Sequence, residues 1–312
     1  MMAVFGAQVL AVLLVLVMVL GPALVVVWFI LRQRRRDRQA RKSPLTGKLL
    51  RTPGHTLRAQ LEEARSDLGF DLMSLMIAPA FALAFLYVTN LVTDRAHPVA
   101  LLAVLLGLVA VVCVYQARKL LRSSIQMDQW RLGLDAEMAV GQELDQLLRH
   151  GAAVFHDLAG EKFNIDHVVI ARQGVFAVET KGYRKPNRDG GATDARVIYD
   201  GEVLKFPEWS GAGALRQAAR NAHWLSEWLT GATGEGIDVT PVVALPGWFV
   251  EHKGRGPVFV FSGAQLKDHL LKVRDAKPLS AEQVQRVTRQ VEQRCRDVNP
   301  YYRPIEDDAP GR

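Results

Sequence analysis

The chain has 312 residues, of which 49% are hydrophobic and 23% charged, and its formal net charge is +7. This length leaves room for a membrane portion and one sizeable domain. The two cysteines, Cys113 and Cys295, lie far apart in the sequence, which excludes a disulfide framework and a Cys/His zinc site and favours a reducing compartment.

Three apolar stretches predict three transmembrane helices, one within residues 1–32 and two that form a hairpin over residues 72–117. The first stretch lacks the basic start and the cleavage site of a signal peptide, so a spanning helix is favoured. Between Arg32 and Arg58 there are ten Lys/Arg residues and one acid, whereas the loop after the second stretch has one of each. This asymmetry predicts a multi-pass protein of the inner cell membrane, with the N-terminus outside and everything after the third span in the cytosol.

The basic character of the chain comes from residues 32–58, because the part from Asp128 onward has 24 Lys/Arg against 26 Asp/Glu. The basic loop therefore predicts contact with the anionic lipid of the inner leaflet rather than binding of nucleic acid by this loop. Residues 33–71 are interpreted as a basic cytoplasmic linker with an amphipathic helix.

Residues 128–298 are predicted to form one domain, followed by a flexible tail at 299–312. A helix-period pattern over 128–149 is followed by a strand and two strand pairs, and the second pair turns at Asp200-Gly201, a strong hairpin signal. Further elements are predicted as helices at 214–229, 263–271 and 280–295 and as strands at 238–246 and 257–261. The pattern indicates an α/β fold, a mixed sheet flanked by helices, whose first strands are antiparallel.

The first strand pair, "NIDHVVIARQGVFAVETKGY" (164–183), places charges inside an apolar pattern. If "ARQG" connects the strands symmetrically, Ile170 lies opposite Val175 and Asp166 opposite Glu179. Alternation then puts Lys181 on the same face, one step beyond Glu179. Because opposed side chains have Cβ atoms about 5 Å apart, the two carboxylates are expected to converge.

Two close carboxylates repel each other, and a divalent cation such as Mg²⁺ or Mn²⁺ removes the conflict. Asp166, Glu179 and the backbone carbonyl of Thr180 are the candidate metal ligands. Lys181 would position a water molecule and offset charge on a phosphate. The pattern thus predicts metal-assisted hydrolysis of a phosphodiester. The alternative is a metal-free cluster in which Lys181 neutralises both acids.

The same stretch resembles the centre of the nuclease-related domain (NERD), a branch of the PD-(D/E)xK nuclease superfamily. The resemblance, over about residues 130–245, implies a restriction-endonuclease-like core with Asp166, Glu179 and Lys181 in the active site. It also implies supporting roles for Glu143, from "AVGQELDQLL", and for Gln217, from "LRQAARNAHWL". The proline that the family pattern leads us to expect shortly before Gln217 is absent, which leaves the approach to that helix open.

A metal-dependent nuclease displayed at the membrane, acting on DNA rather than RNA, is the function that these features favour. A catalytically silent module of the same fold, binding nucleic acid or a protein partner at the membrane, is the main alternative, and a membrane-docked scaffold is a third. Because relatives that lose activity typically lose one of the acids or the lysine, the presence of all three favours the enzyme. His167 and the tryptophans Trp209, Trp224 and Trp228 are interpreted as packing residues.

Overall fold

The computed structural model describes residue 21 and residues 25–33, 47–93, 99–186, 195–272 and 277–299. The chain divides into two compact units. One consists of residues 48–62 and 127–299 and is called the compact domain below; the other includes residues 63–126. The compact domain holds the predicted site hairpin.

Two long helices run through both units. Helix α2 (His55–Thr93) has 39 residues and helix α3 (Val99–Asp145) has 47. Within residues 63–126, polar contacts join the two helices. The ammonium of Lys119 lies 2.7 Å from the carboxylate of Asp71, and the amide of Gln116 donates to the hydroxyl of Ser74.

The prediction of three transmembrane helices is not supported. Among the described residues, no helix combines the length and the apolar character needed to cross a membrane. The stretch 72–117 is divided between α2 and α3, which both continue into segments with charged side chains. Hydropathy alone marked the apolar stretches without showing where their helices end. Most of the first stretch, residues 1–20 and 22–24, lies outside the described residues, as do residues 34–46 of the basic loop. The predicted contact with lipid is not supported by the described part of the chain.

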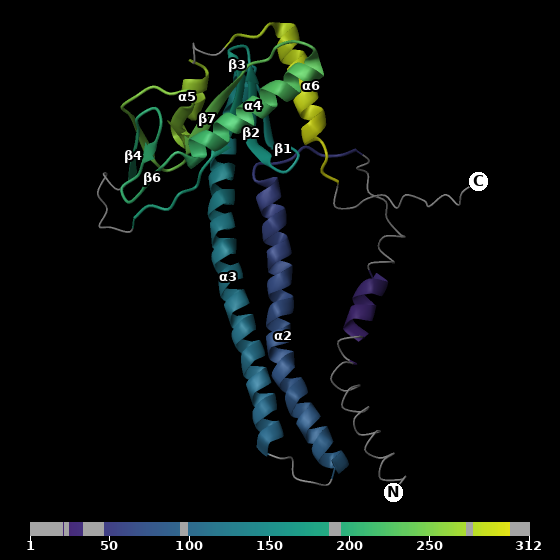
Figure 1. The fold of residues 1–312 in the computed structure, drawn as a ribbon. Helices are drawn as coiled ribbons and strands as arrows, with labels where there is room; N and C mark the ends of the chain where they lie inside the picture. The colour runs from purple at the N-terminus through teal and green to yellow at the C-terminus, as the bar shows by residue number, and fades with distance from the viewer. Residues whose placement is uncertain are drawn as a thin grey trace, which may run out of the picture. The chain divides into compact units, whose positions relative to one another are not determined.

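A five-stranded mixed sheet with strand order β1-β2-β3-β7-β9 forms the centre of the compact domain (Figure 1). Strand β2 (Asn164–Ala171) pairs in antiparallel fashion with β1 (Ala153–Ala159) on one side and with β3 (Gly174–Thr180) on the other. Strands β7 (Val239–Leu245) and β9 (Phe259–Ser262) then run parallel to β3. The predicted α/β fold with an antiparallel start is confirmed.

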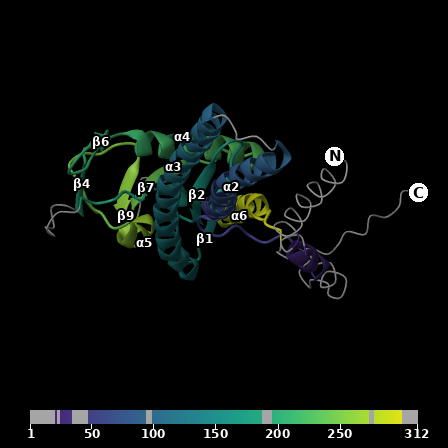
Figure 2. The same ribbon diagram turned by 90° about the horizontal axis from the view of Figure 1, so that it is seen from below.

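Helices cover both faces of this sheet. On one face lie α4 (Gly213–Thr233) and α6 (Ala281–Cys295). On the other face lie the end of α3, the 3-10 turn η1 (Gln146–His150) and α5 (Leu266–Leu270). A second 3-10 turn, η3 (Gly263–Gln265), leads into α5. Figure 2 shows α4 and α5 on opposite sides of β7 and β9. These helices fix the positions of the strand ends that carry the candidate site.

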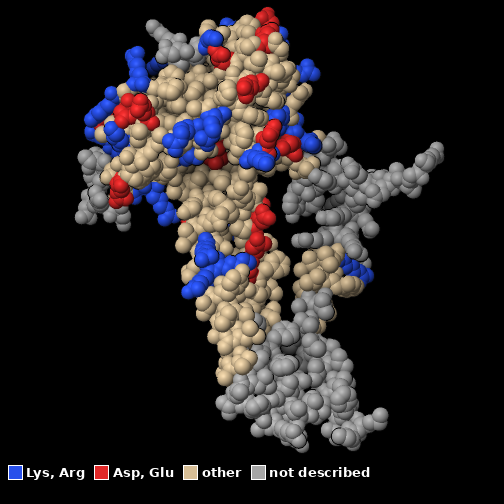
Figure 3. Space-filling view, viewed as in Figure 1, with Lys and Arg blue, Asp and Glu red and all other residues tan. Residues whose placement is uncertain are grey.

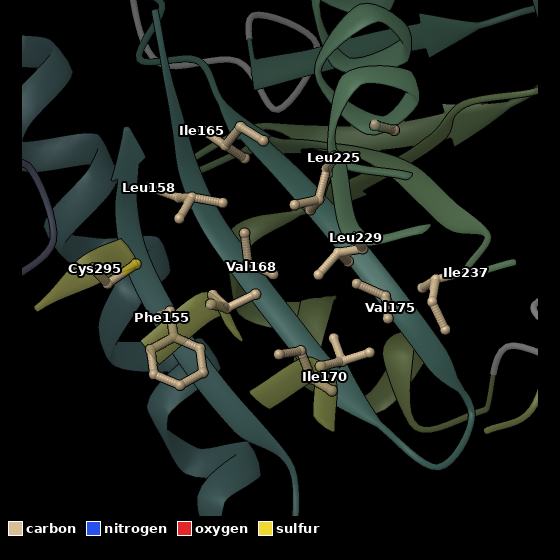
Figure 4. Close-up of a cluster of buried hydrophobic side chains, with 14 residues drawn as sticks. Phe155, Leu158, Ile165, Val168, Ile170, Val175, Leu225, Leu229, Ile237 and Cys295 are labelled. Carbon is tan, nitrogen blue, oxygen red and sulfur yellow. The ribbon is translucent and has the colours of Figure 1, made fainter. Parts of the chain in front are cut away.

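The apolar face of α4 follows from its sequence. Alanines and leucines recur with helical spacing, and Ala222, Leu225 and Leu229 are buried against the sheet. Figure 4 shows Leu225 and Leu229 over Val168 and Val175 of the β2–β3 hairpin. Burying each such side chain stabilises the fold by about 1.5–3 kcal/mol.

A second, smaller sheet has the order β6-β5-β4-β8. The predicted hairpin at Asp200-Gly201 is confirmed: Tyr199 pairs with Leu204, and Gly201 has the positive φ of 103° that favours glycine. The edge strand β8 was not predicted, because its four residues follow another strand closely. The strands of this sheet are β4 (Arg196–Tyr199), β5 (Leu204–Lys205), β6 (Ser210–Gly211) and β8 (Phe249–His252).

Asp157 ties the start of α2 into the compact domain. It is the one described non-glycine residue with positive φ (53°), and it is fully buried. Its carboxylate accepts hydrogen bonds from the backbone N–H and the hydroxyl of Thr56, at 2.9 and 2.6 Å, and lies 3.2 Å from Arg51 Nη1. An acid at a helix N-terminus is favourable for the exposed N–H groups there. Residues 48–62 are therefore part of the domain's structure.

Replacing Gly141 by alanine should destabilise the compact domain, although alanine forms helices better than glycine. A Cβ at this position of α3 would lie 2.5 Å from Pro53 Cγ, so the helix and the segment before α2 would have to separate. We expect a net loss of about 1–2 kcal/mol. In the control Gly231→Ala, on α4, the new Cβ meets nothing within 4 Å, and we expect a gain of up to about 1 kcal/mol. Denaturant unfolding checks both values; equal effects would contradict the close packing at Gly141.

Candidate active site

The β2–β3 hairpin has the predicted register. Ile170 pairs with Val175 and Val168 with Ala177, and the pairing ends at His167–Val178. The pair of Ala171 with Gly174 shortens the connection to two residues. Asp166 and Glu179 come directly after the last pair, at the end of the hairpin ladder where backbone groups become free to bond with side chains.

Asp166 is held by the backbone of the neighbouring strand. Its Oδ2 atom accepts a 2.7 Å hydrogen bond from the N–H of Thr180. The side chain is buried, and this burial raises the pKa of Asp166 well above its usual value; the charges of Glu179 and Glu137 raise it further. The structure therefore brings the two predicted acids within electrostatic reach of each other.

Both carboxylate oxygens of Glu179 have side-chain partners. The ammonium of Lys181 lies 2.7 Å from Oε1, and the amide of Asn221 donates to Oε2 at 2.8 Å. Glu179 is 2% exposed, and burial raises its pKa, while Lys181 and Asn221 act in the opposite direction. The ion pair of Lys181 is with Glu179, whereas Asp166 bonds to the backbone.

Lys181 remains an ammonium ion in this environment. Burial lowers its pKa, but the carboxylate of Glu179 beside it outweighs burial, so the pKa of Lys181 is raised. A lysine with a raised pKa is a poor general base at neutral pH. It is well suited to offset negative charge on a phosphate.

A third carboxylate, Glu137 of α3, joins this cluster. It is 7% exposed, and its Oε2 atom is buried without a hydrogen-bond partner. Burial raises the pKa of Glu137 to about 7, with additional effects from the charges of Asp157 and Glu179. Asp166, Glu179 and Glu137 are called the carboxylate cluster below. One ammonium leaves this cluster with excess negative charge when all three acids are ionised.

The cluster fits a divalent cation by its chemistry. Hard carboxylate oxygens are the ligands that Mg²⁺ and Mn²⁺ prefer, and a cation would offset the repulsion that raises these pKa values. In the part of the chain that the structure describes, no three His, Cys, Asp or Glu side chains already surround a common point as metal ligands do. The donors are thus the right kind, and the unpartnered Glu137 oxygen is a free donor among them.

The comparison with protein families agrees with this geometry. The family model of the nuclease-related domain (NERD) matches residues 132–246. The matched range contains the whole carboxylate cluster, Lys181 and Asn221. The mixed sheets of the compact domain, flanked by helices, fit a nuclease-like core. Neither the comparison with curated proteins nor that with solved structures finds a match.

Glu137 was missed because only part of the buried face of α3 was predicted. The predicted seam was Trp130, Leu134, Met138, Gly141, Leu144 and Leu148; Gly141 and Leu144 are buried, but Leu148 is 54% exposed. The buried line follows Ala136, Glu137, Val140, Gly141, Leu144 and Leu147. An acid in line with these small and apolar residues was the available signal, since an acid is seldom fully buried unless it is paired.

Glu143, the acid that was predicted instead, has different contacts. It is half-buried on α3, and its carboxylate accepts a 3.1 Å hydrogen bond from Gln146. Gln146 in turn accepts one from Lys267 of α5. Glu143 is not among the groups with the largest effects on the pKa of Asp166 or Glu179, and its supporting role stays a prediction.

Gln217 lies one helical turn before Asn221 on the same side of α4. The residue of α4 that contacts Glu179 directly is Asn221, which is 6% exposed. Asn221 was missed because only the family pattern pointed to this helix, and that pattern marked the glutamine. Asn221 follows Gln217 by four residues, on a helix face that also carries Ala218 and Ala222. This spacing could have indicated Asn221 as a site residue.

His167 is a packed histidine, as predicted. It is fully buried, with Nδ1 2.8 Å from His156 Nδ1 and Nε2 3.2 Å from the hydroxyl of Thr180. His156 continues to Asp145, at 3.1 Å. Burial and the neighbouring His156 lower the pKa of His167, so it is neutral. This chain of contacts holds Thr180, the residue whose N–H binds Asp166.

Proposed function

We propose that this protein is a nuclease that hydrolyses phosphodiester bonds with Mg²⁺ or Mn²⁺, on a PD-(D/E)xK core. The observation that carries the proposal is the convergence of Asp166, Glu179 and Lys181 at the end of the β2–β3 hairpin, inside the range that matches the nuclease-related domain. Buried acids with strongly raised pKa values beside a cation are typical of functional sites.

Asp166, Glu179 and the carbonyl of Thr180 would hold the metal, with Glu137 as a further carboxylate donor. When bound, a divalent cation polarises the phosphate and lowers the pKa of a bound water. Thr180 positions Asp166 through its N–H, and Asn221 positions Glu179 through its amide. Lys181 contributes its positive charge to the phosphate as negative charge develops on it.

DNA is proposed as the substrate in preference to RNA, and the cytosol as the place of action, both as the sequence predicts. Gln217 and Glu143 are proposed as supporting members of the site. The silent-module alternative also has a specific observation in its favour, because both oxygens of Glu179 already have partners. In that case Lys181 and Asn221 would hold Glu179 permanently.

The deciding experiment uses the purified full chain with labelled single- and double-stranded DNA and RNA. Each substrate is incubated with Mg²⁺, with Mn²⁺ or with chelator, beside the Lys181→Ala variant. We expect cleavage that requires the metal and falls by about 10²–10³-fold in the variant, the effect of losing one charge-stabilising group. If the folded wild type cleaves no substrate and calorimetry detects no Mn²⁺ binding, the enzyme proposal fails and the silent module replaces it.

A further inference from the structure

A stack of aromatic rings lies beside the candidate active site. The rings of Phe206 and Trp209 are parallel within 18°, with centroids 4.2 Å apart. Trp248 packs edge-on against Phe206 from within the domain and is 3% exposed. Phe206 is buried and Trp209 is 44% exposed. Trp209 is therefore the outermost ring of a stack that is rooted in the core.

Neither of the two rings that contact Trp209, those of Phe206 and Tyr183, stacks on its outer face. The ring centroid of Tyr183 is 5.0 Å from that of Phe206 and 4.9 Å from that of Trp209. A ring at equal distance from two stacked rings lies beside the stack and not on top of it. Tyr183 thus supports the edges of both rings, and Phe206 covers only the inner face of Trp209.

Tyr183 connects this stack to the active site. It follows Lys181 by two residues, a separation of about 7 Å along an extended chain. The charges of Lys181 and Glu179 both act on the Tyr183 phenol. The segment is fixed in place: the indole N–H of Trp248 donates to the carbonyl of Tyr183 at 3.2 Å. A Cβ at Gly182 would lie 2.8 Å from the carbonyl oxygen of Leu132.

Positive charge lies next to the same site. Arg216 and Arg220 are exposed on the first half of α4, and Figure 3 shows Lys and Arg side chains gathered over this part of the helix. Arg220 lies within electrostatic reach of Glu179. Guanidinium groups bind the phosphates of a nucleic-acid strand, largely without regard to its sequence.

We infer that the substrate is an unpaired nucleic-acid strand, with a base stacked on the outer face of Trp209 while the adjoining phosphate lies at Lys181. An exposed aromatic ring beside basic groups is how single-stranded nucleic acids are bound. A base within a duplex is already stacked on both faces and cannot present one to Trp209. This inference rests on the proposed function and narrows it to a substrate class. It also revises the interpretation of Trp209 as a packing residue, because Trp209 lies outside the helices.

Binding without cleavage tests this inference. The full chain is titrated, in chelator, with a fluorescein-labelled oligothymidylate and with a labelled duplex of equal length, and anisotropy is recorded. We expect tighter binding of the single strand. Trp209→Ala should weaken it by about tenfold, the usual loss of one base–aromatic stack, and Trp209→Phe should restore most of it. Phe249→Ala is the matched control, because Phe249 is 56% exposed on β8 and outside the stack; it should change nothing.

Equal affinity for duplex and single strand, or no effect of Trp209→Ala on a folded protein, would overturn the inference. Cleavage is measured separately with the same proteins and Mg²⁺. If single strands bind through Trp209 and no metal-dependent cleavage occurs, the strand site stands and the nuclease proposal fails. If duplex and single strands are cleaved equally and Trp209→Ala has no effect, the nuclease stands and the choice of an unpaired strand fails.

Discussion

Glu179→Gln is expected to reduce metal-dependent phosphodiester cleavage by about 10³-fold, because a lost carboxylate ligand removes several kcal/mol of charge stabilisation from the transition state. Glutamine has the shape of glutamate but only one acceptor oxygen. Its NH2 group would face one of the two donors, Lys181 or Asn221, which now bind the two oxygens at 2.7 and 2.8 Å. The variant should therefore also lose the fixed position of the side chain and the counter-ion of Lys181.

The stability of Glu179→Gln should change less than its activity. Removing a carboxylate whose pKa is raised by burial also removes the cost of burying its charge. Glu227→Gln, on the same helix as Asn221, is the matched control, because the Glu227 side chain is 68% exposed and has His223 as its partner. Kinetics with a labelled oligonucleotide, together with thermal unfolding, separate the two effects. Cleavage that continues at the wild-type rate in a folded Glu179→Gln protein would remove Glu179 from the mechanism.

The sequence was sufficient for the hairpin that carries the candidate site because its pattern is local. Alternation of side chains and a short connection determine the register of a hairpin. Ile170 and Val175 pair as predicted, and the positions of Asp166 and Glu179 follow from that pair. The α/β class followed in the same way, from strand and helix patterns within short windows.

Long-range packing explains what the sequence did not reveal. Glu137 joins the cluster because α3 turns its Ala136–Leu147 line toward the sheet, and Pro53 packs on Gly141 of that line. The segment 48–62, which covers part of α3, is far from α3 in the sequence. The spacing of apolar residues within α3 therefore could not show which of two neighbouring helix faces is buried. Asn221 reaches Glu179 only because α4 crosses the sheet after β6. Hydropathy likewise could not indicate that α2 and α3 extend beyond their apolar stretches.

The stability of the wild type should fall as pH rises through the range in which Glu137 titrates. The pKa of Glu137 is raised from 4.5 to about 7 in the folded protein. Between these values the folded state holds a proton that the unfolded chain has released, so the free energy of unfolding decreases with rising pH. At about 1.4 kcal/mol per pKa unit, the loss attributable to Glu137 is on the order of 3 kcal/mol. Asp166 and Glu179, whose pKa values are also raised, add to it in the same direction.

Glu137→Gln should therefore be more stable than the wild type at about pH 8 and nearly equal to it at about pH 5. The gain should approach 3 kcal/mol, and the loss of the Glu137 charge also reduces the repulsion on Asp166. This gain in stability is measured by denaturant unfolding in chelator. Tryptophan fluorescence is a suitable signal, because five of the six tryptophans lie in the compact domain. Glu227→Gln should follow the wild-type curve. Parallel curves for Glu137→Gln and wild type would mean that Glu137 is not a buried acid of the cluster.

Mg²⁺ should reverse the stability difference between the wild type and Glu137→Gln, by stabilising the wild type more. A cation that binds the ionised carboxylate cluster stabilises the folded state in proportion to the logarithm of its concentration. Because metal ligands must be deprotonated, this stabilisation should grow as pH rises. The wild type should then recover at about pH 8 the stability that it loses in chelator, whereas Glu137→Gln, with one carboxylate fewer, should gain less. If Mg²⁺ raises the stability of both proteins equally, Glu137 lies outside the metal site, and the cluster binds the cation through Asp166 and Glu179 alone.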